Sequence, residues 1–556
     1  MRTGGEILIE QLARHGVAHI YMVPGESFLP VLDAVHGQAS ISPVTCRNET
    51  GAAMMAEATG KLLGRPGVAL VTRGPGAANA VPGVYIAQQD SSPMVLLIGL
   101  PSRSLTDLPA FQALDIGAIF GGLTKWVTIV AGADDIASAI QRAFKIACCG
   151  RPGPVVLGLP EDVLSQRTST GSVAPAAVES LDISAAKLGA LGNFLAGAQR
   201  PLVLAGGAVW TAQAAAALAE FSERFDVPVA TSFRRQDHFD NRHLCYAGHA
   251  GFNMDEALSA AISASDLIIV LGDALGDVTS QTFKLLTGET RGQDIVHIAL
   301  DPADAVSPFK ATLDIIGSPV RAALALAQLR PARDHAPWAG WRKSLNAAYQ
   351  TSLQPFATPG AVQLEAVITA LSEILPEDAI VTSGAGNYAA FLHRYFVYKT
   401  YPGQLAPLSG SMGYGLPAAI AAKFACPQRT VVAVAGDGCF QMTAQELQTA
   451  VQFELDIVII IANNRSLGTI RMHQEQRYPG RVVATTLVNP DFVAAAVAAG
   501  AMGERVTETS GFRRALQRAL TARGPAVIEL CLDTDAISPV ATIASIRAIS
   551  ICADAE

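Results

Sequence analysis

Charged side chains are scarce in this chain of 556 residues: 16% of the residues are charged, whereas 50% are hydrophobic. The 40 Lys and Arg residues and the 48 Asp and Glu residues give a net charge of −8, with no long basic run. Nucleic-acid-binding proteins carry clustered basic residues. The charge balance therefore argues against nucleic acid as a partner.

Long hydrophobic runs are also missing. No apolar stretch reaches the roughly 20 residues that a membrane-spanning helix requires, so no membrane partner is expected. The N-terminal segment MRTGGEILIEQL becomes amphipathic at once, which is atypical of a signal peptide. The eight cysteines are scattered without metal-site spacing. A reduced, cytoplasmic chain is the expectation from these features.

The length and the pattern of the chain predict several α/β domains. Domains usually contain about 100–200 residues, so a first estimate is three. Short apolar segments such as VALVT and MVLLIG alternate with amphipathic ones, which indicates βαβ units and parallel sheets covered on both faces. We expect three doubly wound parallel-sheet domains over residues 1–165, 185–330 and 358–545, with a linker at 166–184.

The first and third of these segments share a faint similarity. Residues 139–162 and 515–533 each read as an amphipathic helix, a Gly-Pro turn and a strand that ends in an acidic residue. One interpretation is chance, since any βαβ protein produces such patterns. The other is two related domains that flank a different central domain.

The stretch VVAVAGDGCF, residues 431–440, places Asp437 between two glycines at the end of an apolar strand. Ligands of α/β proteins bind at this position, where a strand ends in a Gly-rich turn before a helix. The following TAQE sequence, residues 443–446, has the pattern of a capping box. We therefore expect a helix to start at Thr443.

A second polar pair, Asn463-Asn464, ends the next predicted strand. One strand-helix-strand unit separates it from Asp437, so both side chains should emerge at the same sheet edge. One carboxylate and one amide oxygen suit Mg²⁺, which completes its coordination with phosphate and water. The alternative interpretation is a set of turn-forming polar residues.

Three long segments resemble the thiamine-diphosphate-dependent enzyme family, most closely its acetolactate synthase-like branch. These are residues 73–95, residues 409–425 and residues 436–468, which run from GDGCFQMTAQ to ANNRSLG. They occur in the order of the family, and the resemblance covers most of the chain. It implies a pyrimidine-binding first domain, a central domain and a diphosphate-binding third domain.

The resemblance also implies cofactor ligands. The side chains of Asp437 and Asn464 and the carbonyl of Ser466 would hold Mg²⁺, which binds the diphosphate of thiamine diphosphate. Further implied cofactor contacts are Gly384, Gly386, Asn387, Gly436, Gly438, Cys439 and Gly468. Asn387-Tyr388 departs from the Gln-His pair that the family carries at this place.

Glu49, in TCRNETGAA, is similar to the glutamate that hydrogen-bonds the pyrimidine of the cofactor in this family. Met412 matches the apolar residue that holds the cofactor bent, and Gly410 would offer its carbonyl to the cofactor's amino group. Without the resemblance, Glu49 reads as an acid that stabilises a helix start, and Met412 reads as a core residue. Because Glu49 and Asp437 come from different subunits in the family, a homodimer or homotetramer is implied.

The branch implies a carboligation of 2-oxo acids such as pyruvate: the donor is decarboxylated and joined to a second carbonyl. Gln112, in FQALD, and Lys125, in TKW, match the substrate channel of the branch, although Lys125 also reads as a surface lysine. His473 stands where enzymes of this branch carry a Trp that selects the second substrate. The segment LGDALGDVTS lacks the Arg of the family's flavin-contacting segment, which argues against bound FAD.

Three other functions stay open. A non-ligating 2-oxo acid decarboxylase is one, although the ten histidines are isolated in sequence and the His-His pair of pyruvate decarboxylases is missing. A thiamine-dependent lyase of a CoA thioester is another, but the C-terminal tail here is apolar to mildly acidic, not basic. Intact Glu49, Asp437 and Asn464 argue against the third, a non-catalytic regulatory relative.

Overall fold

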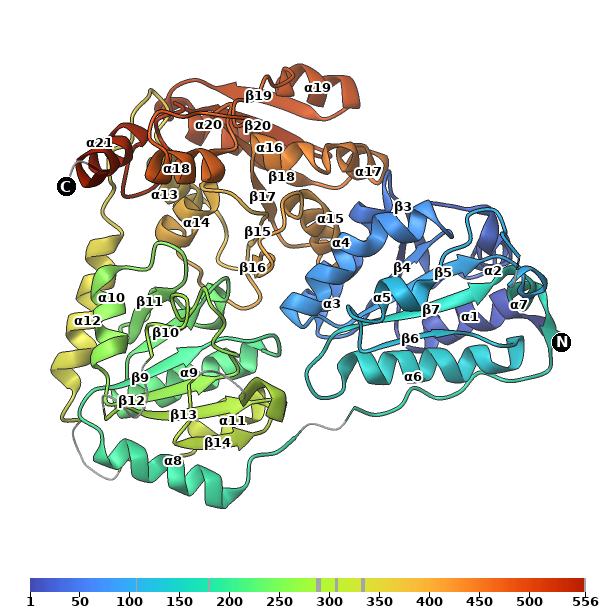
Figure 1. Cartoon of the computed structure of the whole chain (residues 1–556), viewed down its shortest axis with the longest axis horizontal. Helices are drawn as coiled ribbons and strands as arrows, with labels where there is room; N and C mark the ends of the chain where they lie inside the picture. The colour runs from blue at the N-terminus through green and yellow to red at the C-terminus, as the bar shows by residue number, and fades with distance from the viewer. Residues whose placement is uncertain (107, 179–180, 287–291, 306–308, 332–335, 555–556) are drawn as a thin grey trace.

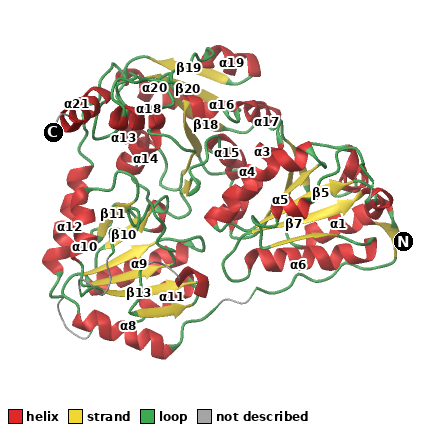
Figure 2. Cartoon of the chain, viewed as in Figure 1, coloured by secondary structure: helices red, strands yellow, loops and turns green. Residues whose placement is uncertain are grey.

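Three six-stranded parallel sheets organise the chain, each with helices on its faces (Figure 1). The structure is a computed structural model that describes residues 1–106, 108–178, 181–286, 292–305, 309–331 and 336–554. Figure 2 shows strands and helices alternating throughout each of the three parts. The predicted α/β class with three doubly wound parallel sheets is confirmed. Within the described residues, no helix combines the length and apolar character needed to cross a membrane.

The first sheet has the strand order β3-β2-β4-β5-β7-β6. Its strands are β2 (His19–Met22), β3 (Ser42–Thr45), β4 (Gly67–Val71), β5 (Met94–Leu100), β6 (Trp126–Ile129) and β7 (Pro154–Pro160). Its helices are α1 (Gly4–Arg14), α2 (Leu29–His36), α3 (Glu49–Leu63), α4 (Pro75–Asp90), α5 (Ile116–Phe120), α6 (Ile136–Cys148) and α7 (Glu161–Ser165). Strands β4, β5 and β7 are buried along their whole length, as expected of strands covered on both faces.

The third sheet has the order β16-β15-β17-β18-β20-β19. Its strands are β15 (Ile380–Ser383), β16 (Gln404–Leu405), β17 (Val431–Gly436), β18 (Ile457–Asn463), β19 (Met502–Val506) and β20 (Ala526–Cys531). Its helices are α13 (Leu364–Ile374), α14 (Tyr388–Tyr395), α15 (Gly415–Ala425), α16 (Asp437–Gln441), α17 (Leu447–Gln452), α18 (Gly468–Arg477), α19 (Phe492–Ala499), α20 (Phe512–Thr521) and α21 (Ile543–Asp554).

The first and third sheets follow one topology. Numbered by their order along the chain, the strands of both sheets lie in the sequence 2-1-3-4-6-5. The similar segments at 139–162 and 515–533 contain α6 with β7 and α20 with β20, which occupy equivalent places. Chance similarity does not require this match of topology, so the interpretation as two related domains is the better one.

The central sheet differs, with the order β11-β10-β9-β12-β13-β14, or 3-2-1-4-5-6 along the chain. Its strands are β9 (Pro201–Ala205), β10 (Val229–Ser232), β11 (Tyr246–Ala250), β12 (Leu267–Leu271), β13 (Asp294–Ala299) and β14 (Leu313–Ile316). The helices around it are α8 (Ala185–Gly197), α9 (Ala212–Phe225), α10 (Glu256–Ala264), α11 (Pro319–Leu326) and α12 (Ala339–Ser352).

Buried ionic groups join the three parts of the chain. Helix α3 packs against α15 of the third part, and one apolar core extends through both. At this junction Lys61 contacts Glu57 at 3.1 Å and Asp90 at 2.6 Å. The Tyr414 hydroxyl donates to Glu57 at 2.6 Å, and Arg235 of the central part lies 3.7 Å from Asp90. Since charges this well buried must be paired, the network fixes how the parts meet.

The C-terminal helix α21 docks on α18, which itself follows the loop after β18. Arg547 of α21 donates to both oxygens of Glu475 of α18, at 2.7 and 2.8 Å. Ile537, Ile543 and Ile546 add an apolar contact to Met472. The hydrogen bonds from Arg547 hold the pKa of Glu475 at about 2, below its usual value of 4.5.

We predict that Arg547→Ala releases α21. The fully buried Glu475 loses its bidentate partner, so amide hydrogen exchange should rise in residues 543–554 and in α18. Because the folded pKa of Glu475 is depressed, the docking should be complete above pH 4.5 and weaken as the pH falls toward 2. The control is Arg513→Ala, whose ion pair with Glu373 is about half exposed on both sides and should contribute little. Unchanged exchange in Arg547→Ala would contradict this role.

Candidate functional site

A cavity of about 460 Å³ lies at the carboxyl edge of the third sheet, where the neighbouring strands β15, β17 and β18 end. Strands β15 and β17 flank the point where the strand order reverses, which is where α/β sheets bind ligands. The predicted site residues that line this cavity are Gly386, Asn387, Gly410, Met412, Gly436, Asp437, Gly438, Cys439, Asn464, Ser466, Gly468 and His473. The fold therefore brings together segments that are distant in sequence.

Asp437 directly follows β17 and is the first residue of α16. Its side chain is 2% exposed, and its Oδ2 accepts a 2.6 Å hydrogen bond from Nδ2 of Asn489. Burial raises the pKa of Asp437 above its usual value. A buried carboxylate that lines a cavity and lacks an ion-pair partner among the described side chains is a suitable ligand for a cation.

The two asparagines after β18 have different environments. Asn464 lines the cavity, and its Oδ1 accepts a 3.1 Å bond from the backbone amide of Ser466. Asn463 instead donates to Glu529 at 2.7 Å and accepts from Asn489 at 2.9 Å. Adjacent residues at a strand end point to opposite sides, so only the second asparagine faces the cavity.

Asn489 is a site residue that sequence reasoning missed. One amide group holds both Asp437 and Asn463, and its carbonyl accepts from Gln441 at 2.9 Å. It thereby sets the position of the Asp437 carboxylate. Asn489 lies in a loop outside the three similar segments, where the only signal is a polar residue before Pro490.

The donor set fits a hard cation with few protein ligands. The carboxylate of Asp437 and the side-chain amide of Asn464 belong to residues that line the cavity, and Ser466 lines it beside them. In the described parts of the chain, no three His, Cys, Asp or Glu side chains gather to hold a metal. Mg²⁺ commonly uses one or two carboxylates and oxygens from a phosphate ligand, which is the kind of site that a single carboxylate beside Asn464 suits.

Glycines allow close approach to the backbone around the cavity. Gly386 has φ of 148°, and a Cβ at Gly436 would lie 3.0 Å from the ring of Tyr388. The Tyr388 hydroxyl is hydrogen-bonded to the amide of Gly384, at 3.0 Å, and to Sγ of Cys439, at 3.3 Å. Gly384 thus lies behind the cavity wall and is not among its lining residues.

Glu49 begins α3 and is 9% exposed, with a 2.9 Å hydrogen bond from Asn79 to its Oε2. A Cβ at Gly76 of α4 would lie 3.2 Å from its Oε1, so only glycine leaves that face free. Gln112 lies against Gly74, just before α4. Neither Glu49 nor Gln112 lines the Asp437 cavity of the same chain.

Lys125 occupies a different place. It lines a second cavity of about 390 Å³ together with Arg151 of the first part and Asp301 of the central part. Its ammonium group donates to the carbonyl of Cys149, and burial lowers the pKa of Lys125. The structure of one chain thus separates Lys125 from the residues around Asp437.

A helical run does begin one residue after Thr443, but Thr443 does not cap it with its side chain. A helix already begins at Asp437, and the TAQE segment forms a short 3₁₀ turn, Ala444–Glu446, before α17. The Thr443 hydroxyl donates to the carbonyl of Gly413 at 2.6 Å instead of capping a helix. Glu446 accepts from the amides of Arg47, at 3.1 Å, and Asn48, at 2.9 Å. Tertiary contacts therefore use both side chains of the apparent capping box.

Glu446 consequently positions Glu49. Its carboxylate is fully buried and also accepts from the hydroxyl of Thr449 at 2.7 Å. The two amides it binds lie directly before α3, whose first residue is Glu49. A residue of the third part thus anchors the start of a helix in the first part.

Side chains of the central part form the remaining wall of the Asp437 cavity. Phe233, Arg234, Phe252 and Asn253 line it, together with His393 of α14. The histidines, isolated in sequence, do not stay apart in space: the rings of His249 and His393 lie 5.5 Å apart between centroids. No sequence motif predicted this wall.

Three family descriptions match the chain. The N-terminal TPP binding domain of thiamine pyrophosphate enzymes matches residues 2–119, the central domain matches residues 189–329, and the C-terminal TPP binding domain matches residues 384–530. The Asp437 cavity lies mostly within the last range, and Glu49 lies within the first.

The chain is also similar to acetolactate synthases over nearly its whole length. It is 32% identical to the mitochondrial acetolactate synthase catalytic subunit of Aspergillus candidus, covering 96% of this chain and 81% of that protein. It is 32% identical to the large subunit from Parasynechococcus marenigrum, covering 95% and 87%. It is 31% identical to the isozyme 3 large subunit of Escherichia coli, covering 94% and 92%.

We predict that Glu446→Gln destabilises the chain by about 2–4 kcal/mol, because an amide has one acceptor oxygen for three donors and buries an unsatisfied NH₂ group. Urea unfolding should measure this loss. The control is Glu508→Gln, an exposed acid of the same part of the chain, which should leave the free energy of unfolding unchanged. Equal stability of the two variants would show that Glu446 does not anchor α3.

Proposed function

Because the chain belongs to the thiamine pyrophosphate enzyme family, we propose that it is a Mg²⁺- and thiamine-diphosphate-dependent enzyme of 2-oxo acids such as pyruvate. The proposed reaction decarboxylates a donor and joins it to a second carbonyl, in the manner of acetolactate synthase. One observation carries the proposal: Asp437, Asn464 and Ser466 share one cavity at the switch point of the third sheet. The similarity to acetolactate synthases supports the choice of reaction.

We assign the diphosphate end of the cofactor to the third part of the chain. Asp437, Asn464 and the carbonyl of Ser466 would hold Mg²⁺, and the backbone near Gly386, Gly438 and Gly468 would approach the phosphates. Asn387 lines the same cavity, where its Nδ2 donates to the carbonyl of Ile537 at 2.9 Å, so it would lie near the phosphates. Buried ligand atoms of fixed position suit a metal ion with its bound phosphate, because they need no rearrangement on binding.

We assign the pyrimidine end to Glu49, Gly410 and Met412. Glu49 would hold a proton at the pyrimidine nitrogen, and its hydrogen bond from Asn79 fixes the carboxylate orientation. Gly410, with φ of 66°, would present its carbonyl to the amino group, and Met412 would pack beneath the bent cofactor. When bound, thiamine diphosphate supplies the carbon nucleophile that makes loss of CO₂ from a 2-oxo acid possible.

The separation of Glu49 from the Asp437 cavity supports an oligomer. Since Glu49 does not line that cavity in one chain, a complete site would combine the first part of one chain with the third part of another. We therefore propose a homodimer or homotetramer. Gln112, which lies beside α4 near Glu49, would enter the site from the same subunit as Glu49.

The second substrate would bind next to α18. His473 lines the cavity there, and its Nδ1 lies 3.0 Å from Oε1 of Gln476. A polar imidazole at this position would favour small or oxygenated acceptors. The change in selectivity should be modest, since an extra methylene in an apolar pocket is worth only about 1–3 kcal/mol. Lys125 lines the second cavity, so it would contact a substrate carboxylate only at a site elsewhere in the chain or in another subunit. FAD is not part of the proposed enzyme.

Product analysis with a panel of 2-oxo acids tests the proposed reaction. Wild-type protein with Mg²⁺ and thiamine diphosphate should release CO₂ from pyruvate and yield a 2-hydroxy-2-substituted oxo acid.

Glu49→Gln should retain the fold and the cofactor but lose about 10²–10⁴-fold in turnover, because an amide cannot act as an acid or base. The exchange rate of the C2 hydrogen of bound cofactor should fall in parallel. Release of free aldehyde alone would contradict carboligation, and an unchanged exchange rate would contradict the role of Glu49.

Asp437→Ala should abolish Mg²⁺-dependent cofactor retention, because the diphosphate then meets an incompletely neutralised site. Retention is measured by gel filtration and assay of bound thiamine diphosphate. The matched control is Asp378→Ala, which removes an exposed carboxylate at the amino end of the same sheet. Full cofactor retention by Asp437→Ala after exhaustive EDTA dialysis would refute the metal assignment.

A further inference from the structure

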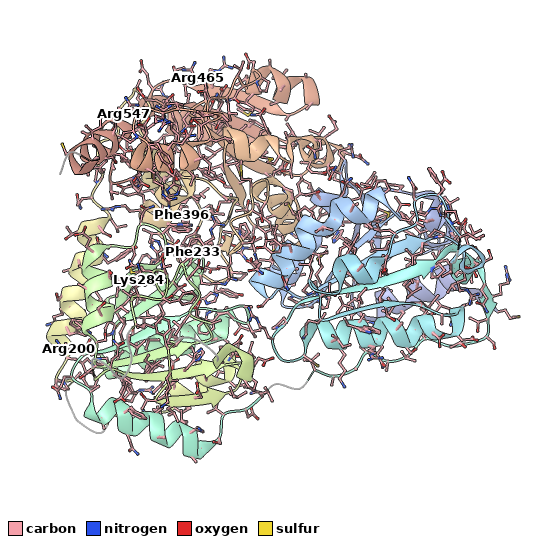
Figure 3. The ribbon with its side chains drawn as sticks, in the orientation of Figure 1. Arg200, Phe233, Lys284, Phe396, Arg465 and Arg547 are labelled. Carbon is pink, nitrogen blue, oxygen red and sulfur yellow. The ribbon has the colours of Figure 1, made fainter. Side chains whose placement is uncertain are left out.

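The central-part wall of the Asp437 cavity carries a positive charge that has no ion-pair partner among the described side chains. Arg234 follows β10 in a left-handed conformation, with φ of 57°, and is 4% exposed. It lines the cavity beside Phe233, whose ring lies 4.9 Å from the guanidinium carbon. Figure 3 places Phe233 where the central part meets the C-terminal part.

Two carbonyls of the third part occupy only some of the Arg234 donors. Nη2 donates to Gly384 at 2.9 Å and Nη1 donates to Pro407. A guanidinium group has five N–H donors, and the Nε–H of Arg234 is buried with no partner. The bonds to carbonyls hold the side chain in place without neutralising its charge.

Asp90, the carboxylate whose charge acts on Arg234, already has other partners. Asp90 contacts Lys61 at 2.6 Å and Arg235 at 3.7 Å, and it accepts from the amide of Leu408 at 2.8 Å. Arg234 has no carboxylate within ion-pair distance among the residues that the structure describes. A buried charge without a counter-charge is costly, so this wall should favour an anionic ligand.

Two neighbouring histidines, His393 at the cavity and His249 beside it, have unused nitrogen atoms. His393 is 5% exposed and lines the cavity, and neither of its ring nitrogens has a hydrogen-bond partner. Nε2 of His249 is also buried and unpartnered. Burial lowers the pKa of both histidines, with the charge of Arg234 adding to the effect on His393. Burial thus favours the neutral form of both rings, in which each has one N–H donor.

We propose that Arg234 and His393, with His249 behind them, bind a carboxylate of the substrate that is remote from its reacting carbonyl. Arg234 Nε–H and one N–H of His393 supply two donors for the two oxygens of a carboxylate, and charged donors and acceptors make the strongest such bonds. A phosphate would need more donors than this wall provides. The identity of the ligand as a substrate rests on the proposed function, whereas the carboxylate site itself does not.

Access to the site depends on aromatic side chains. The unpartnered nitrogens are shielded from water, so the ligand reaches them only when a neighbouring ring moves. Phe252 lines the cavity, is 59% exposed and contacts Phe233 edge-on at 5.2 Å between centroids. Phe252 is therefore the exposed ring of this wall whose movement the proposal requires.

Calorimetric titration of the full chain with succinate and with butyrate tests the proposal without requiring turnover. Succinate carries two carboxylates and butyrate one. Sites built to hydrogen-bond a ligand group reject the analogue that lacks it, so succinate should bind at least about tenfold more tightly. His393→Phe keeps the ring and the packing but removes the donor, and it should abolish this preference. Arg234→Lys should weaken it, because a lysine lacks the Nε–H donor.

The matched control is His238→Phe. His238 is also a buried histidine with an unpartnered nitrogen, but it stacks on Trp210 at 5.0 Å and does not line the cavity. It should leave the preference for succinate unchanged. Equal binding of succinate and butyrate by the wild type, or a preference that survives in His393→Phe, would overturn the proposal. Neither result would bear on Mg²⁺-dependent cofactor retention, so failure of this site and failure of the proposed function are distinguishable.

Discussion

The burial of one carboxylate at the end of β17 constrains the whole site. Asp437 is held by an amide group of Asn489 and by the backbone at the start of α16, and no basic side chain that the structure describes pairs with it. A buried acid in this state is stable only as a neutral group or beside a cation. Gly436, Gly438 and Asn464 line the same cavity, which under the proposed function would admit a cation and its phosphate ligand beside this carboxylate.

The site also depends on contacts between the three parts of the chain. Glu446 of the third part anchors the start of α3, the Tyr414 hydroxyl of the third part donates to Glu57 of the first part, and Arg235 of the central part lies 3.7 Å from Asp90. Arg234 of the central part donates to the carbonyl of Gly384, in the loop after β15. Each contact uses a buried polar group whose loss leaves a partner unsatisfied. The relative position of the parts is therefore specified by directional bonds in addition to apolar packing.

The sequence was sufficient to predict the fold class and the placement of Asp437 and Asn464, because strand ends and Gly-rich turns are local patterns. It was insufficient where the partner is remote in sequence. Asn489 meets Asp437 across 52 residues, and His249 meets His393 from another part of the chain. The TAQE pattern forms no capping box, because Glu446 binds amides nearly 400 residues away instead. Local motifs do not reveal which tertiary donors compete for a side chain.

Calorimetric titration of the metal-free protein with thiamine diphosphate, thiamine monophosphate and thiamine, each with and without Mg²⁺, tests the central claim most directly. If Asp437 and Asn464 hold a metal that clamps a diphosphate, only thiamine diphosphate should bind tightly, and only when Mg²⁺ is present. Binding of thiamine diphosphate that is equally tight without any divalent cation, or no tighter than that of thiamine, would contradict the account.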